Sequence, residues 1–223
     1  MMTYLKNIMI NCVKFVLWLF VHNLMVLPVF LFYFLKFGHG TFAQITLTIL
    51  CSAIGLITIA FLYKHYRSTL NSNNPQHFMF RSIFKEKPWK WIFTAIITIS
   101  WIVLQFNWPG ESSGDENATV GLLSLYPVPM LIVVSILGPI YEELLNRGLF
   151  FSYFIKSNAW YAQVLGLLGS SLVFGLLHST SVSWATLGYV ISGIVLGLIY
   201  LITKNIRFGI FAHLVNNIIA AVG

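Results

Sequence analysis

The sequence predicts an all-α protein, a polytopic transmembrane helix bundle of about seven helices, within a range of six to eight. Of its 223 residues, 58% are hydrophobic and only 9% are charged, whereas soluble domains carry about 25% charged residues. The apolar residues gather in runs near 20 residues, the length at which a helix spans a bilayer. A membrane barrel would instead need short strands of alternating polarity.

Seven apolar segments are expected to form these helices. They cover residues 13–35, 43–63, 91–106, 126–146, 159–178, 184–202 and 207–222. Lys6 and Lys14 precede the first segment, as in a signal peptide, but the run is too long and no small-x-small cleavage motif follows it. We therefore expect the first helix to be retained.

Two loops of opposite charge predict the orientation in the membrane. The loop 64–90 contains Lys64, Arg67, Arg81, Lys85, Lys87 and Lys90 and a single acidic residue, Glu86. The loop 107–120 contains Glu111, Asp115 and Glu116 and no Lys or Arg. Because basic loops stay on the cytoplasmic side, the loop 64–90 and the N-terminus are predicted to be cytoplasmic.

The net charge of +7 is explained by these loops, so the lipid bilayer is the expected partner. No basic stripe lies outside them, which argues against nucleic-acid binding. The two cysteines, Cys12 and Cys51, lie in apolar segments at a spacing that suggests neither a disulfide nor a metal site.

Two adjacent glutamates, Glu142 and Glu143, stand at the end of an apolar segment. Glu143 and Arg147 are four residues apart, so on a helix they share a face and can form an ion pair. Glu142 points about 100° away, and its neighbour at the same spacing is Asn146, which cannot neutralise it. Glu142 is thus a candidate general base. The alternative is that both glutamates face water at the end of a helix.

The histidines divide into two groups. His178 and His213 lie in or at the end of apolar segments, and Asn217 follows His213 on the same helix face. His39, His65 and His77 are predicted to lie in loops. His22 and Asn23 interrupt the first segment, and we interpret them as a polar pair facing the bundle, without an assigned role. Ionisable groups at membrane depth are functional candidates because burying them is costly.

Three motifs occur in order along the second half of the chain. They are Glu-Glu-x-x-x-Arg at 142–147, Phe-x-x-x-His at 174–178 and His-x-x-x-Asn at 213–217. Together they resemble the signature motifs of the CAAX protease and bacteriocin-processing family of intramembrane proteases, over about residues 125–222. The expected organisation is an N-terminal helix pair with a basic cytoplasmic loop in residues 1–90 and a protease core of this family in residues 91–223.

The resemblance also implies roles for individual residues. Glu142 and His178 would hold and deprotonate the attacking water. His213 and Asn217 would donate hydrogen bonds to the oxyanion of the tetrahedral intermediate, and Glu143 and Arg147 would be structural. No metal is expected to be required, although zinc held by Glu142, His178 and His213 is the alternative, and no H-E-x-x-H motif is present.

The family resemblance predicts an endopeptidase that acts on a membrane-associated peptide or protein in a bacterial plasma membrane. Bacteriocin processing, self-immunity or peptide signalling would be its setting. The alternatives are a non-catalytic immunity or scaffold protein and, less well supported, a small transporter with a proton relay, for which inverted repeats are missing.

One conflict arises within these expectations. If each predicted segment crosses the membrane once, His178 lies near the membrane face opposite that of Glu142. A helix break at Gly138–Pro139, with a separate short helix over 148–157, would reconcile the two.

Overall fold

The computed structural model describes residues 2–72, 74–109, 114–179 and 183–222, and these ranges form an all-helical bundle without strands. Its helices are α1 (Met2–Asn23), α2 (Leu27–Phe34), α3 (Thr41–Ser72), α4 (Pro88–Gln105), α5 (Gly114–Leu125), α6 (Pro127–Ile132), α7 (Gly138–Glu143), α8 (Phe150–Phe154), α9 (Trp160–His178), α10 (Trp184–Thr203) and α11 (Ile206–Val222). Three short turns complete them: the 3₁₀ turn η1 (Ile83–Lys85) and the π-helical turns η2 (Val133–Leu137) and η3 (Leu144–Leu149).

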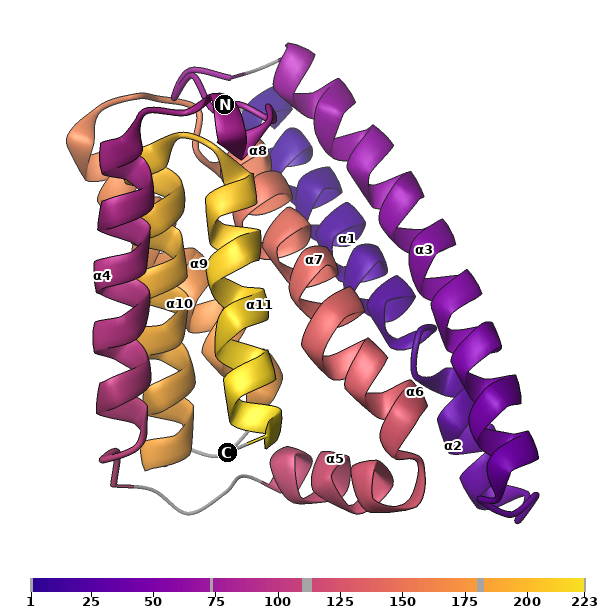
Figure 1. The fold of residues 1–223 in the computed structure, drawn as a ribbon. Coiled ribbons are helices and arrows are strands. Elements are labelled where there is room, and N and C mark those ends of the chain that lie inside the picture. The colour runs from indigo at the N-terminus through magenta and orange to yellow at the C-terminus, as the bar shows by residue number, and fades with distance from the viewer. Residues whose placement is uncertain (1, 73, 110–113, 180–182, 223) are drawn as a thin grey trace.

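Five helical stretches are long and apolar enough to cross a membrane. They are Leu5–Asn23, Thr41–Ser72, Pro127–Phe154, Trp160–His178 and Trp184–Thr203. The shorter apolar helix α11 and the 18-residue helix α4 lie alongside them (Figure 1). The chain is therefore an integral membrane protein, and the predicted helical membrane bundle is confirmed.

The N-terminal helices differ from their predicted bounds. The segment predicted as one helix over 13–35 is two helices, α1 and α2, with Pro28 in the first turn of α2, where its missing N–H costs nothing. Helix α3 runs on to Ser72, so Lys64 and Arg67 are helical. His65, predicted to lie in a loop, is also helical, and its Nε2 lies 2.5 Å from the Tyr153 hydroxyl.

The predicted break at Gly138–Pro139 is wrong. Residues Pro127–Phe154 form one continuous helical stretch of 28 residues, in which η2 and η3 flank α7. In η2 the Gly138 N–H reaches the Val133 carbonyl, five residues back. The wide turn therefore accommodates Pro139, which has no N–H to donate to the previous turn. Continuity to Phe154 moves Glu142 from a helix end to the middle of a long helix.

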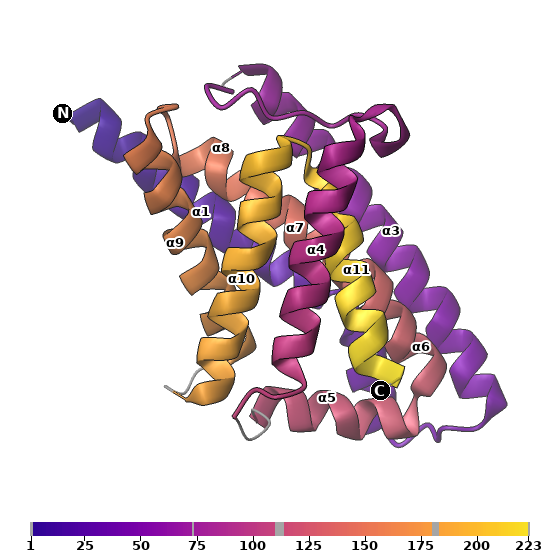
Figure 2. The ribbon, with the colours of Figure 1, turned by 60° about the vertical axis from the view of Figure 1, so that its left-hand side comes forward.

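Helix α5 occupies part of a segment predicted to be a loop. The predicted loop 107–120 included its residues from Gly114 onwards, whereas Glu111 lies outside the described residues. α5 runs across the end of the bundle (Figure 1), and Figure 2 shows it beneath α4 and α11.

The two ends of the bundle differ in charge. One end holds the end of α3, the start of α4, the end of α10 and the start of α11 (Figure 1). Its Lys and Arg residues include Lys64, Arg67, Arg81, Lys85, Lys87, Lys90, Lys156, Lys204 and Arg207. We call this the basic end. The other end, which holds α2 and α5, is the α5 end, and Lys36 is the one Lys or Arg residue of the described ranges there.

A buried carboxylate organises the basic end. Glu86 accepts hydrogen bonds from Arg81 Nε at 2.6 Å and Lys90 Nζ at 2.8 Å. Asn205 Nδ2 donates to the same carboxylate at 3.1 Å, and Lys90 also donates to the Thr203 carbonyl at 2.6 Å. These bonds tie the start of α4 to the turn between α10 and α11, so they fix where α11 begins.

Acid is expected to weaken this connection. The hydrogen bond from Arg81, followed by those from Lys90 and Asn205, lowers the pKa of Glu86 from 4.5 to about 2, against the opposing effect of burial. A carboxylate whose pKa is lowered in the folded state stabilises the fold fully above its unfolded pKa, and this contribution disappears as the pH falls towards 2. We expect the thermal midpoint of the detergent-solubilised protein to fall by about 5 °C between pH 6 and pH 3. In Glu86→Gln the midpoint should be lower at pH 6 and nearly constant over that range, and an equal fall in both proteins would contradict this role.

Helices α9 and α10 pack closely because of small residues. A Cβ atom added to Gly175 would lie 2.3 Å from Val190 Cγ2, and one added to Gly193 would lie 2.8 Å from Ser171 Cα. Small residues allow membrane helices to approach in this way. The close contact brings His178, the last residue of α9, and the Gly193 carbonyl of α10 to the same region of the bundle interior.

Candidate active site

Glu142 lies at the centre of the candidate site. Its side chain is 15% exposed, and the two carboxylate oxygens face different helices. Oε2 lies 3.6 Å from His178 Nε2 and 3.8 Å from His213 Nε2, whereas Oε1 lies 3.5 Å from His22 Nε2. The structure thus brings together the predicted Glu142, His178 and His213, and it adds His22.

The ring of His178 is oriented by its own helix and by two aromatic rings. Its Nδ1 lies 2.8 Å from the Phe174 carbonyl, which can only accept, so Nδ1 carries the hydrogen. In the neutral ring Nε2 is then an acceptor that faces Glu142. The Phe174 and Tyr189 rings lie against the imidazole, with centroids 4.4 and 4.8 Å away.

His213 bridges the two adjacent glutamates. Its Nδ1 lies 3.2 Å from Glu143 Oε1 and its Nε2 faces Glu142. An ionised carboxylate only accepts hydrogen bonds, so Nδ1 donates to Glu143. The predicted structural role of Glu143 is therefore incomplete, because this side chain also orients the ring of His213. Gly209 makes room for it, since an added Cβ there would lie 2.8 Å from Glu143 Oε2.

The Glu143–Arg147 pair expected from the i,i+4 spacing is present and fully buried. Arg147 Nη1 lies 3.2 Å from Glu143 Oε1, and both side chains are 0% exposed. Arg147 Nη2 donates to the Gly193 carbonyl at 2.9 Å, and its guanidinium lies 4.7 Å from the Phe174 ring centroid. Both glutamates therefore lie inside the bundle, and the alternative that they face water at a helix end is wrong.

Asn217 lies one turn beyond His213 and lines the same cavity. Its Nδ2 donates to the Val134 carbonyl at 3.0 Å. Val134 is five residues before Pro139, so in a π-helical turn its carbonyl is the one that the missing proline N–H would have reached. A primary amide has two N–H hydrogens, and the second is not used in this bond.

Two site residues were missed in the sequence analysis. His22 was recognised as a polar residue within an apolar segment, but its distance of 120 residues from Glu142 gives no sign of contact. Tyr189 stacks on His178 with an interplanar angle of 25°, and nothing in its apolar surroundings distinguishes it from other aromatic residues of the bundle.

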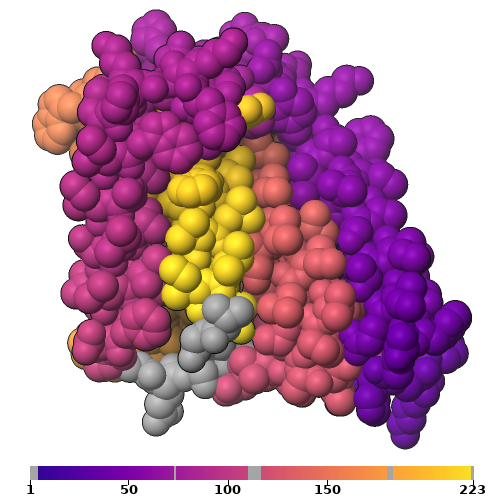
Figure 3. Space-filling model, in the orientation of Figure 1, coloured from indigo at the N-terminus to yellow at the C-terminus, as the bar shows by residue number. Residues whose placement is uncertain are grey.

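A cavity of about 880 Å³ adjoins the Glu142 carboxylate. Glu142, the three histidines and Asn217 line its inner part. Among the other elements that line it are α4, α5 and the last turn of α11, which contribute Trp101, Gln105, Val120, Leu123 and Ala221. The cavity therefore extends from mid-bundle to the α5 end. On the face shown in Figure 3, α11 is visible between α4 and the continuous helix of α6 and α7.

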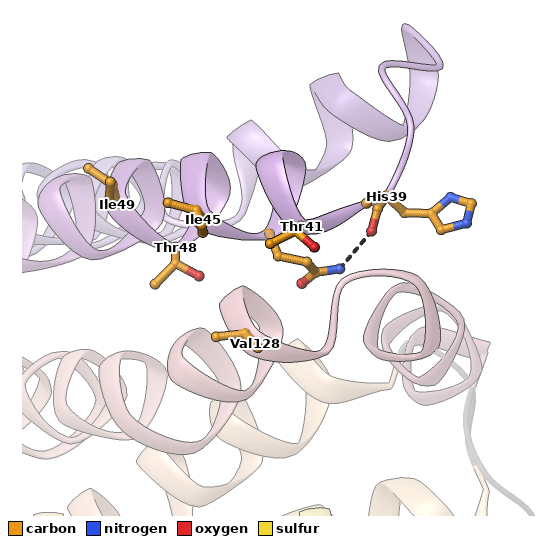
Figure 4. A pocket seen from close by; sticks show the side chains of 8 residues that line it. His39, Thr41, Ile45, Thr48, Ile49 and Val128 are labelled. Carbon is orange, nitrogen blue, oxygen red and sulfur yellow. Dashed lines mark hydrogen bonds between the residues drawn. The ribbon is translucent and has the colours of Figure 1, made fainter.

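A second pocket lies apart from this cavity, between the start of α3 and α6 (Figure 4). Its volume is about 640 Å³ and its walls include Ile45, Ile49 and Val128. Gln44 Nε2 donates to the carbonyls of His39 and Leu125, at 3.2 and 2.8 Å. None of the described residues that line this pocket carries a carboxylate, so we place the candidate site at Glu142.

The donor atoms of the site bear on the question of a bound metal. Within the described ranges, no group of three or more His, Cys, Asp or Glu side chains has a geometry suited to a metal ion. We derive no step through a metal.

Comparisons with known proteins agree with this arrangement. The family model described as type II CAAX prenyl endopeptidase Rce1-like matches residues 123–219. "Putative membrane peptidase YdiL" of Bacillus subtilis (strain 168) is 34% identical over 109 residues, which cover 48% of this chain and 42% of that protein. The match thus spans less than half of the relative's length. No solved structure matches the chain significantly. The region similar to the Rce1-like family model, residues 123–219, contains Glu142, His178, His213 and Asn217.

Proposed function

We propose that the protein is an intramembrane endopeptidase that hydrolyses a peptide bond of a membrane-associated peptide or protein. One observation carries this proposal: Glu142 Oε2 faces the Nε2 atoms of His178 and His213, at 3.6 and 3.8 Å, on the wall of a cavity. A carboxylate beside two imidazoles, away from bulk water, is an arrangement suited to general acid–base catalysis.

In the proposed reaction, Glu142 and the neutral Nε2 of His178 both act as acceptors. Two acceptors 3.6 Å apart suit a water molecule that donates one hydrogen bond to each. The water oxygen attacks the peptide carbonyl carbon as its proton passes to Glu142. Glu142 then gives this proton to the amide nitrogen, the C–N bond breaks, and a carboxylic acid and an amine are released. The second proton of the water, which stays on the acid, passes to the amine as the two products ionise.

The developing oxyanion needs hydrogen-bond donors. His213 and Asn217 stand on one face of α11 along the cavity, which supports the role that the family resemblance gave them. The contact from His213 Nδ1 to Glu143 would keep this ring in place. Nε2 would donate to the oxyanion from the protonated ring, in which both nitrogens carry a hydrogen. Donors of this kind are each worth about 2.7–4 kcal/mol in the transition state.

The direction of the cavity supports a particular class of substrate. With the basic end cytoplasmic, as the charge bias predicts, the N-terminus is cytoplasmic and the cavity extends to the outer side of a bacterial plasma membrane. The proposed substrate is then a peptide segment reached from that side, such as a leader peptide or a pheromone precursor. Bacteriocin maturation, self-immunity and peptide signalling are the settings that supply such peptides.

This orientation predicts the labelling of single cysteines in a background lacking Cys12 and Cys51. Val120, at the outer part of the cavity, is 57% exposed, and Phe84, at the basic end, is 88% exposed. On intact cells, a membrane-impermeant maleimide should label Val120→Cys and leave Phe84→Cys unlabelled until the membrane is permeabilised. The reverse pattern would place the basic end outside and contradict the proposed direction of access.

The proposed function is tested in a host from which the gene has been deleted. The strain is complemented with wild type or with Glu142→Gln at matched abundance, and peptides from membranes and medium are compared by mass spectrometry. We expect a precursor peptide that disappears only in the strain with wild type. In a bacteriocin-producing host, the strain with Glu142→Gln should also lose protection against the cognate bacteriocin. Equal peptide profiles for the two proteins would instead support the alternative, a non-catalytic immunity or scaffold protein.

A metal requirement is tested in the same assay with purified protein. We propose that no metal is needed, so turnover should be unchanged after treatment with a zinc chelator. Loss of turnover that added zinc restores would favour the alternative of zinc bound by Glu142, His178 and His213.

A further inference from the structure

His22 contacts the site from a helix outside the segment 123–219. It lies in the last turn of α1, and its Nε2 is 3.5 Å from Glu142 Oε1. Its ring also lies against Tyr141, with centroids 5.0 Å apart and an interplanar angle of 33°. The Tyr141 hydroxyl in turn donates to the Trp18 carbonyl of α1 at 2.8 Å. The end of α1 is thus attached to α7 by adjacent side chains, Tyr141 and Glu142.

The contacts of Glu142 are divided between its two oxygens. Oε1 faces His22, whereas Oε2 faces His178 and His213. Terminal carboxylate torsions are broad, so a carboxylate held on one side alone would sample several orientations. A partner for Oε1 restricts that motion and keeps Oε2 directed at the two histidines.

The surroundings of His22 distinguish it from a histidine that only joins two helices. Its side chain is 30% exposed and lines the catalytic cavity. The chain turns immediately after it, with Met25 N–H donating to the His22 carbonyl at 3.3 Å, so the ring stands at the end of a helix. His65 provides the contrast, because it joins α3 to Tyr153 and Trp18 away from Glu142.

We propose that His22 is a positioning residue of the active site, which holds Glu142 Oε1 so that Oε2 stays directed at His178 and His213. Helix α1, outside the segment 123–219, then completes the catalytic centre. This inference rests on the proposed peptidase function, and it assigns to the N-terminal region a part in the reaction itself.

The test is kinetic, with purified protein in liposomes and the peptide that wild type cleaves fastest from a synthetic library of hydrophobic peptides. We expect His22→Ala to lower kcat by about 10- to 100-fold, the range expected from misplacing a reacting group, with KM within about two-fold of wild type. His22→Gln should remain within about five-fold of wild type, because its amide can donate to Oε1. The matched control, His65→Ala, should have a kcat per folded protein within about two-fold of the wild-type value.

A second measurement does not depend on activity. Thermal midpoints are compared for His22→Ala, Glu142→Gln and the double variant. Contacting residues give non-additive effects, so the shift of the double variant should differ from the sum of the single shifts by at least about 2 °C. Additive shifts, a kcat for His22→Ala within two-fold of wild type, or equal losses of kcat in His22→Ala and His65→Ala would each overturn the inference. Residual turnover of Glu142→Gln near the wild-type value would instead overturn the proposed function.

Discussion

Replacing Arg147 with Met is expected to destabilise the protein by about 3–5 kcal/mol, the largest effect on folding that we predict for a single substitution. The guanidinium is fully buried and faces Glu143, and it also donates to the Gly193 carbonyl. Without it, the Glu143 charge remains inside the bundle, with His213 as its hydrogen-bond partner. The thermal midpoint in detergent and the amount of membrane-inserted protein measure this loss.

Two further variants make the Arg147 test specific. Arg67→Met removes a guanidinium from an exposed position on α3 and should change the midpoint by less than about 2 °C. The double variant Glu143→Leu/Arg147→Met removes both charges and should recover much of the stability, because well-packed apolar residues can replace a buried ion pair. It should nevertheless be nearly inactive, since His213 loses its Nδ1 partner. A midpoint for Arg147→Met close to wild type would contradict the structural role of the pair.

Glu142→Gln is expected to lower kcat by at least about 1,000-fold, within the range by which general acid–base groups contribute to catalysis. Glutamine has nearly the same shape and keeps contacts with His22 and His178 within reach, but it cannot accept the proton of the attacking water. The fold should therefore be retained. The measurement is turnover of purified protein in liposomes, normalised to folded protein.

Glu143→Gln is the matched control for Glu142→Gln, because it makes the same chemical change one residue away. Its amide oxygen can still accept from His213 Nδ1, so kcat should fall by only about 10- to 100-fold. Its thermal midpoint should fall more than that of Glu142→Gln, since Arg147 loses its ionised partner. If Glu142→Gln kept more than a tenth of wild-type turnover, or if Glu143→Gln were the less active variant, the assignment of the general base would be wrong.

The helices and contacts that the sequence predicts best are those indicated by patterns among neighbouring residues. Helices α9 and α10 begin and end within one residue of the predicted segments 159–178 and 184–202, because apolar runs there are bounded by polar turns. The Glu143–Arg147 pair followed from helical spacing alone. These signals need no knowledge of which helices are neighbours.

The predictions that failed depended on contacts between distant parts of the chain. Charges usually mark the end of a membrane segment, and for this reason the sequence predicts that the fourth segment ends at Asn146. Glu143 and Arg147 can stay inside a helix because α10 and α11 supply the Gly193 carbonyl and His213. The position of His22 beside Glu142 is likewise a result of how α1 packs against α7, which no local pattern encodes.

The wide turns η2 and η3 have a consequence for the length of the central helix. A backbone hydrogen bond that spans five residues encloses one residue more than an α-helical hydrogen bond. Each wide turn therefore absorbs one extra residue, and the helical segments on its two sides still present the same faces to their neighbours. Loss of a single residue within either wide turn could be accommodated by closing it to α-helical geometry. Loss of a residue from α7 would instead rotate one flank by about 100° and turn the carboxylates away from α9 and α11. Insertions and deletions among related chains should therefore concentrate at the wide turns and spare the six residues between them.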